Sequence, residues 1–253
     1  MRNFYENYSL VDAGRPDSDR GLYELFNNRY SNAKKHFDLA ITASPRNLFF
    51  YERRACVNIM LKLFEEAIAD IDTYLMLFKP NYYVSSKYGV YNLKIISLIS
   101  LNKLAMALEL TEELLSLFPG SVKTHYFTGI IYSKSNDFAS ALSSFKLANP
   151  ATSYGSNKLP IHTHRHVLKL IDFLSNQDFL KTGKVDDKLF SITYPASFFG
   201  EVMHEGRQAI EYLDRISGKR YHTPAANFID YTNTKTCERC QMSPCHCSDP
   251  DLD

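Results

Sequence analysis

The chain has 253 residues, of which 45% are hydrophobic and 13% aromatic, and this composition excludes a wholly disordered protein. Its 29 lysines and arginines nearly balance its 28 aspartates and glutamates, so the formal net charge is +1. Such a balance produces no overall attraction to nucleic acid or to an anionic membrane surface. We therefore expect neither of them as a partner.

The N-terminal stretch holds Arg2 and Glu6 and has no apolar core, unlike a signal peptide. The most apolar stretch, Ile95 to Leu101, is interrupted by serines. It is far shorter than the roughly 18–20 residues that a membrane span needs. We expect no membrane insertion and a cytoplasmic location, with the nucleus or a cilium as alternatives.

An internal repeat is marked by alanines spaced 34, 40 and 34 residues apart: Ala33, Ala67, Ala107 and Ala141. A period in this range is typical of stacked helical hairpins. Three more columns keep the same phase: Gly21, Ala55, Ile95 and Gly129; Tyr30, Phe64, Leu104 and Phe138; Phe37, Ile71, Thr111 and Phe145. Small residues let two helices touch, and large apolar residues one turn along fill the space between them. The sequence therefore predicts an all-α solenoid of helical hairpins.

This pattern resembles the tetratricopeptide repeat (TPR) family, with about four degenerate units between residues 14 and 150. The unit that begins at Val122 matches best, and the one from Leu48 is nearly as good. The unit from Tyr88 follows a six-residue insertion and replaces the small residue of the first helix. The first unit has Asp17 and Arg20 where apolar residues are expected, which weakens the prediction of its first helix.

In the TPR family, first-helix residues line the inner surface that holds a partner. The register places these residues there: Phe49, Glu52, Cys56, Ile59 and Met60; Asn92, Ile96 and Ile99; Lys123, Tyr126, Ile130 and Lys134. The resemblance thus implies an apolar groove with a basic edge. Such a groove suits an amphipathic helix or an extended segment of a partner protein.

One TPR subset binds the C-terminal carboxylate of a chaperone through converging Lys, Arg and Asn side chains. The corresponding positions here are Ser18, Leu22, Arg53, Gly89 and Leu93. Capture of a carboxylate needs several converging donors. With a single cation in this set, we do not expect a chaperone C-terminal clamp.

The predicted organisation is a flexible leader over 1–13, the repeat array over 14–150, a linker over 151–160, helices over 161–218 and a poorly ordered tail over 219–253. Apolar residues recur at helical spacing from Val167 to Leu174 and from Phe198 to Ile216. We expect these helices to cap the last repeat, because the end of a solenoid must be covered. The alternatives are a small separate domain, or a helix that fills the chain's own groove.

The histidines His162, His164 and His166 lie at the predicted start of a helix and are interpreted as exposed polar residues, because a nearby carboxylate that would complete a metal site is missing. The sequence has no phosphate-binding loop, no dinucleotide fingerprint, no serine-hydrolase elbow and no His-Glu-x-x-His motif. We therefore predict that the protein is not an enzyme.

The tail holds a cluster of four cysteines: Cys237, Cys240, Cys245 and Cys247. Four thiolates on one short segment have the ligand chemistry of a structural zinc site. Unligated thiols in a flexible tail are the main alternative. Disulfides are a third possibility, although they are uncommon in the cytosol.

The sequence is thus interpreted as a non-enzymatic interaction adaptor or scaffold subunit of a larger assembly. The alternative is a zinc-stabilised regulatory module whose Cys-rich tail engages the partner. A loose likeness of the second unit to co-chaperones and to axonemal dynein assembly proteins suggests a further variant of the first interpretation.

If the four tail thiols share one zinc ion, protein purified in metal-replete, chelator-free buffer should carry close to one equivalent. The double substitution Cys237→Ser, Cys240→Ser should abolish this zinc without melting the repeats, because solenoid units depend mainly on their neighbours. Elemental analysis and thiol alkylation measure both. Four freely alkylated tail thiols with little zinc would contradict the prediction.

Overall fold

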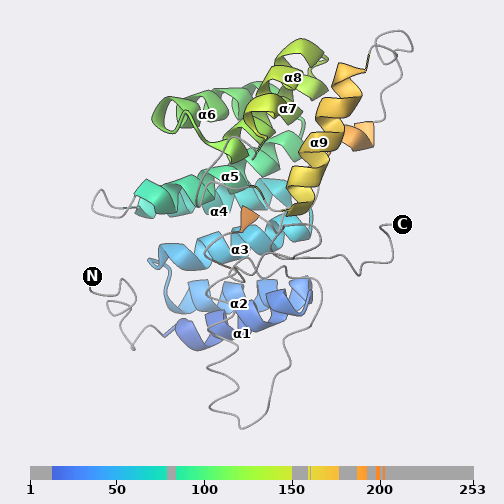
Figure 1. Cartoon of the computed structure of the whole chain (residues 1–253). Helices are drawn as coiled ribbons and strands as arrows, with labels where there is room; N and C mark the ends of the chain where they lie inside the picture. The colour runs from blue at the N-terminus through green and yellow to red at the C-terminus, as the bar shows by residue number, and fades with distance from the viewer. Residues whose placement is uncertain are drawn as a thin grey trace, which may run out of the picture.

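A computed structural model describes residues 13–78, 84–149, 159, 161–176, 187–192, 198–199 and 202. Every regular element in these ranges is helical (Figure 1). The elements are α1 (Arg15–Phe26), α2 (Tyr30–Ala43), α3 (Leu48–Met60), α4 (Phe64–Leu77), α5 (Val84–Ser100), α6 (Leu104–Leu117), α7 (Val122–Lys134), α8 (Phe138–Leu147), α9 (Ile161–Ser175) and the short 3-10 helix η4 (Asp187–Phe190). The tail beyond residue 202 lies outside the described residues, and the predicted boundaries of leader, linker and tail stay predictions.

The helices form four successive hairpins that stack in chain order from α1–α2 to α7–α8 (Figure 1). The second helix of each hairpin packs on the first helix of the next one. The first helices α1, α3, α5 and α7 also contact one another in sequence, so they form one face of the array, here called the inner face. The predicted all-α solenoid is confirmed, and α9 packs on α8 at its end.

The first unit does contain its first helix, contrary to the weakness inferred from its polar residues. Helix α1 has a proline in its first turn, a position where the fixed proline φ favours a helix. Arg20 is exposed and Asp17 is half-exposed, whereas Leu22, Leu25 and Phe26 are buried. The polar residues thus face away from the core and do not interrupt it.

The turn inside each hairpin has the same backbone geometry. One residue of each turn has a positive φ of 57–62°: Asn28, Lys62, Asn102 and Asn136. The next residue's N–H donates to a carbonyl five positions earlier, at 2.8–2.9 Å in all four turns. This is the Schellman ending of a helix, in which a left-handed residue reverses the chain. The turn geometry therefore repeats with the same spacings as the alanines.

In the first and fourth hairpins a small residue on the first helix faces a large one on the second. The four repeat alanines are fully buried. A Cβ atom added to Gly21 would lie 2.7 Å from Phe37 Cε1, and one added to Gly129 would lie 2.5 Å from Phe145 Cε1. Each phenylalanine ring therefore occupies the space that a side chain on the glycine would take.

The third unit exchanges the sizes of this pair. Ile95 stands at the position of Gly21 and Gly129, and Thr111 stands at the position of the phenylalanines. Both Ile95 and Thr111 are fully buried. A large residue on the first helix is thus matched by a smaller one on the second, which keeps the packed volume similar.

Polar contacts connect neighbouring hairpins. Arg54 on α3 binds Asp70 on α4 (Nη2–Oδ1 2.6 Å) and Asp38 on α2 (Nη1–Oδ1 2.8 Å). The Asn58 amide also donates to Asp70, at 3.0 Å. A buried carboxylate that accepts hydrogen bonds from Arg54 and Asn58 keeps its charge compensated. The pair of Arg54 with Asp38 links the second unit to the first, and the bonds to Asp70 hold α3 and α4 together within the second unit.

Gly129→Ala should lower the melting temperature, because its Cβ would overlap the Phe145 ring. Overpacking of this kind costs about 1–3 kcal/mol. The matched control is Gly89→Ala on α5, where an added Cβ meets nothing within 4 Å. Replacing this helical glycine should stabilise the protein by roughly 0.5–1 kcal/mol. Thermal and urea unfolding measure both, and equal effects would contradict the packing described for Gly129.

Candidate partner-binding site

The predicted partner-binding residues all lie on the first helices of three successive hairpins. Helix α3 carries Phe49, Glu52 and Ile59; α5 carries Asn92, Ile96 and Ile99; α7 carries Lys123, Tyr126, Ile130 and Lys134. Because α3 contacts α5 and α5 contacts α7, the structure places these residues along one continuous side of the array.

Most of these residues are nevertheless inside the protein. Seven of the ten are 8% exposed or less: Glu52, Ile59, Asn92, Ile96, Ile99, Tyr126 and Ile130. Phe49, Lys123 and Lys134 are half-buried. The parts of the predicted surface that a partner reaches directly are therefore the ring of Phe49 and the two lysines on α7.

The ring of Tyr126 lies beneath a residue from far along the chain. Phe198 stacks on Tyr126 with ring centroids 6.0 Å apart and an interplanar angle of 11°. Phe198 also lies 4.8 Å from the ring of Phe127, the next residue of α7. Tyr126 is fully buried and Phe198 is 3% exposed. We call the surface formed by Tyr126 and Phe127 the aromatic seat.

A hydrogen-bond chain joins α7, α9 and η4 beside the aromatic seat. The hydroxyl of Tyr126 lies 3.1 Å from His166 Nδ1, and His166 Nε2 lies 2.8 Å from the carbonyl oxygen of Leu189. A carbonyl only accepts, so Nε2 carries the proton and donates it to Leu189. Nδ1 is then the acceptor for the Tyr126 hydroxyl. His166 is thus half-buried and bonded at both nitrogens, unlike the exposed residue expected from the sequence.

Further aromatic contacts attach the same end of the chain to the last repeat. The ring of Phe190 lies 6.1 Å from that of Phe138 on α8 and 6.2 Å from that of Phe173 on α9. The segment that covers α7 and α8 is here called the C-terminal cover, and it comprises α9, η4, Phe198, Phe199 and Val202. Sequence reasoning named Phe198 as a candidate to fill the groove but did not identify Phe127, Phe190 or Leu189.

Lys123 is a half-buried basic residue of the predicted site. Burial lowers the pKa of its amine, because an ammonium ion loses hydration there. A carboxylate brought close to Lys123 would stabilise its charged form.

Arg53, the one cation at the clamp positions, is engaged within the chain. Its guanidinium donates to the hydroxyl of Ser18 and lies over the ring of Phe50, 5.8 Å from the centroid. Leu22 and Leu93 at neighbouring clamp positions are each 1% exposed. The clamp positions therefore present packing contacts and one internally bonded arginine.

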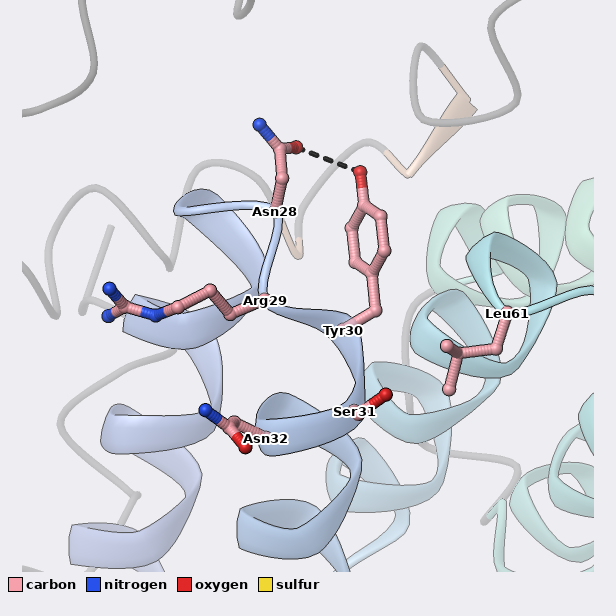
Figure 2. Close-up of a pocket in the computed structure, with 6 residues that line it drawn as sticks. All are labelled: Asn28, Arg29, Tyr30, Ser31, Asn32 and Leu61. Atoms are coloured by element: carbon pink, nitrogen blue, oxygen red, sulfur yellow. Dashed lines mark hydrogen bonds between the residues drawn. The ribbon is translucent and has the colours of Figure 1, made fainter.

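A shallow hollow of about 250 Å³ lies at the turn of the first hairpin. Its lining residues are Asn28, Arg29, Tyr30, Ser31, Asn32 and Leu61. Figure 2 shows the Tyr30 hydroxyl bonded to the Asn28 side chain, at 2.8 Å, with Arg29 pointing away from this pair. Burial raises the pKa of Tyr30, so its hydroxyl stays protonated at neutral pH. The lining carries no carboxylate, histidine or thiol to act as a general base or nucleophile.

The described residues include no group of three or more His, Cys, Asp or Glu side chains that could hold a metal ion. The cysteines predicted to bind zinc, Cys237, Cys240, Cys245 and Cys247, lie outside that part of the chain, so the zinc site stays a prediction. Cys56 is fully buried. Among the described helices, none has the length and apolar character needed to cross a membrane.

Solved structures with a similar fold exist, although no protein-family model and no curated protein matches the sequence significantly. MamA (residue 41 to its end) from Desulfovibrio magneticus RS-1 aligns with a TM-score of 0.50 and 14% identity, over 77% of this chain and 96% of its own. A MamA RS-1 ArsTM double mutant gives a TM-score of 0.50 and 15% identity, over 77% and 95%. YrrB, described as a TPR protein with an unusual peptide-binding site, aligns with a TM-score of 0.47 and 12% identity, over 82% of this chain and 94% of its own.

The resemblance to MamA, a TPR protein, extends over most of both chains and shows a common fold. The protein is therefore an α-solenoid with a TPR-like fold. At 14–15% identity the likeness establishes the fold alone.

Acidification should destabilise the protein through His166. Burial and, less strongly, Lys169 lower the pKa of its imidazole, while the bond to the Leu189 carbonyl raises it, and the net shift is downward from 6.5. The unfolded chain then binds more protons than the folded one as the pH falls below about 6.5. The free energy of unfolding is therefore highest above about pH 6.5, and it decreases progressively as the pH falls toward the lowered pKa of the folded state. His164 is shifted in the same direction, by burial and by Arg165.

Urea unfolding at pH 7.5 and pH 5.5 measures this effect. His166→Gln should reduce the loss of stability between the two pH values, leaving the part that His164 contributes. The control is His125→Gln, because the His125 ring bonds the Pro119 carbonyl at the α6–α7 loop, away from the cover. An unchanged pH dependence in His166→Gln would contradict the role given to this histidine.

Proposed function

We propose that the protein is a non-enzymatic adaptor or scaffold subunit that binds a segment of a partner protein along the inner face of its repeat array. The observation that carries this proposal is the aromatic seat. There the ring of Phe198, a residue that belongs to none of the repeats, packs against both Tyr126 and Phe127 of α7. The inner face therefore has the shape and chemistry to hold an inserted aromatic side chain.

The chemistry of the partner follows from the groups around the seat. The rings of Tyr126 and Phe127 favour an aromatic or large apolar anchor. Lys123 and Lys134 on the same helix favour acidic residues beside that anchor. An amphipathic helix or an extended segment with apolar anchors and an acidic flank combines both features.

Helical-hairpin arrays as a class support a binding role, because stacked repeats create extended surfaces from many small contacts. In this chain several ion pairs join neighbouring helices. Arg54, Asp70 and Asp38 are one example. A binding role is the one that this arrangement favours.

Site-specific photo-crosslinking tests the proposed face. A benzophenone amino acid at Phe49, which is half-buried on α3, should capture a partner protein from cells that express the full chain. The matched control places the same group at Leu39, which is 53% exposed on the second helix α2. We expect capture of one defined partner at position 49 and not at 39, identified by mass spectrometry. Capture only at position 39 would place the binding surface on the other side of the array.

Truncation after residue 218 separates this proposal from the alternative in which the Cys-rich tail engages the partner. The inner-face proposal expects the truncated chain to retain the crosslink at position 49. Loss of the crosslink with an unchanged melting temperature would favour the tail.

A further inference from the structure

Helix α7 needs a cover that the repeats themselves do not supply. Its buried residues go all round the helix, and they include Val122, Tyr126, Phe127, Ile130 and Ile131. A helix that is apolar on every side is stable only when every side is covered. Helices α6 and α8 cover two sides, and α5 touches a third. The rings of Tyr126 and Phe127 are covered by Phe198.

The aromatic seat is a local feature of the fourth unit. The positions equivalent to Tyr126 in the other units are Ser18, Glu52 and Asn92. The positions equivalent to Phe127 are Asp19, Arg53 and Leu93. The repeat pattern therefore does not require two adjacent aromatic residues at this place. Tyr126 and Phe127 instead suit the aromatic ring of Phe198 that packs on them.

The contacts at the seat are ones that another protein segment could reproduce. Phe198 contributes one ring stacked on Tyr126 and tilted against Phe127. The Tyr126 hydroxyl is bonded separately, to His166 on α9. Replacing the ring of Phe198 by an external aromatic ring therefore leaves the hydrogen bonds between α7, α9 and η4 in place.

We propose that Phe198 acts as an intramolecular ligand of the aromatic seat, which an external segment with an aromatic anchor must displace. This inference rests on the proposed function and specifies how the inner face is regulated. A ligand tethered to its own site has a high effective concentration. The apparent affinity for a competing segment is then reduced in proportion to the fraction of molecules with a free seat.

The probe for this inference is a fluorescent synthetic peptide with the chain's own sequence over residues 192–206, added to the full-length protein. Wild-type protein should bind it weakly, because Phe198 already occupies the seat. The variant Phe198→Ala should bind it at least tenfold more tightly, and Phe198→Leu should show a smaller gain. A peptide carrying the same Phe198→Ala change should not bind any of the three proteins. Fluorescence anisotropy measures all of these affinities.

The matched control variant is Phe173→Ala, which removes a ring of the C-terminal cover that contacts Phe190 and lies outside the seat contacts of Phe198. It should leave the affinity for the peptide close to the wild-type value. Equal gains in Phe173→Ala and Phe198→Ala would overturn the proposal, because general loosening of the cover would then explain both. Equal binding of the peptide to wild type and Phe198→Ala would overturn it as well.

Circular dichroism during heating decides whether the seat can be vacated. The proposal expects Phe198→Ala and Phe198→Leu to keep the helical signal of the array. Unfolding of the repeats in both variants would overturn the proposal, since Phe198 would then be a permanent part of the core. The crosslink at position 49 does not use the seat or the peptide, so failure of this inference and failure of the proposed function give different results.

Discussion

The close approach of the two helices in each hairpin is the constraint on which the rest of the structure depends. In the first and fourth units the ring of Phe37 or Phe145 lies where a side chain on Gly21 or Gly129 would be. A packed interior tolerates little change of volume. The separation of the two helices in a hairpin therefore fixes how that hairpin presents its outer surfaces to the next one. The Schellman turns, with one left-handed residue each, join the helices at the separation that this packing sets.

Repetition of one hairpin geometry places α1, α3, α5 and α7 side by side and so creates the inner face. Polar side chains then connect adjacent units, most clearly where Arg54, which also pairs with Asp70 of its own unit, reaches Asp38 of the first unit. Such partly buried, multiply bonded ion pairs depend on geometry, so they favour one relative orientation of the hairpins. The inner face is therefore as rigid as the packing beneath it.

The fourth unit differs from the others because the array ends there. Helix α9 packs on α8, and Phe198 lies on Tyr126 and Phe127 of α7. These contacts cover the end of the solenoid. They also occupy the part of the inner face where the resemblance to TPR proteins predicts a partner. The cover is thus held on α7 by a few aromatic rings and by His166, which links Tyr126 to the carbonyl of Leu189.

The sequence by itself determined the repeat, because its causes are local. The in-phase columns around Ala33, Ala67, Ala107 and Ala141 predicted helical hairpins, and the structure contains them. Helical spacing after Val167 also predicted α9, although His166 was wrongly expected to be exposed and is half-buried with both nitrogens bonded. In the first unit, the polar residues Asp17 and Arg20 obscured α1, because sequence position alone does not tell which side of a helix faces solvent.

Only the tertiary structure decided how accessible the predicted inner face is. The resemblance to the TPR family predicted that Tyr126 and Ile130 lie on a binding surface, whereas both side chains are fully buried. Contacts such as those of Tyr126 with His166 and Phe198 join segments far apart in the chain and follow no period. Periodicity reports which residues face a neighbouring helix in the same hairpin or the next one. It contains no information about a segment that returns from beyond the repeats, because that contact depends on the path of the whole chain.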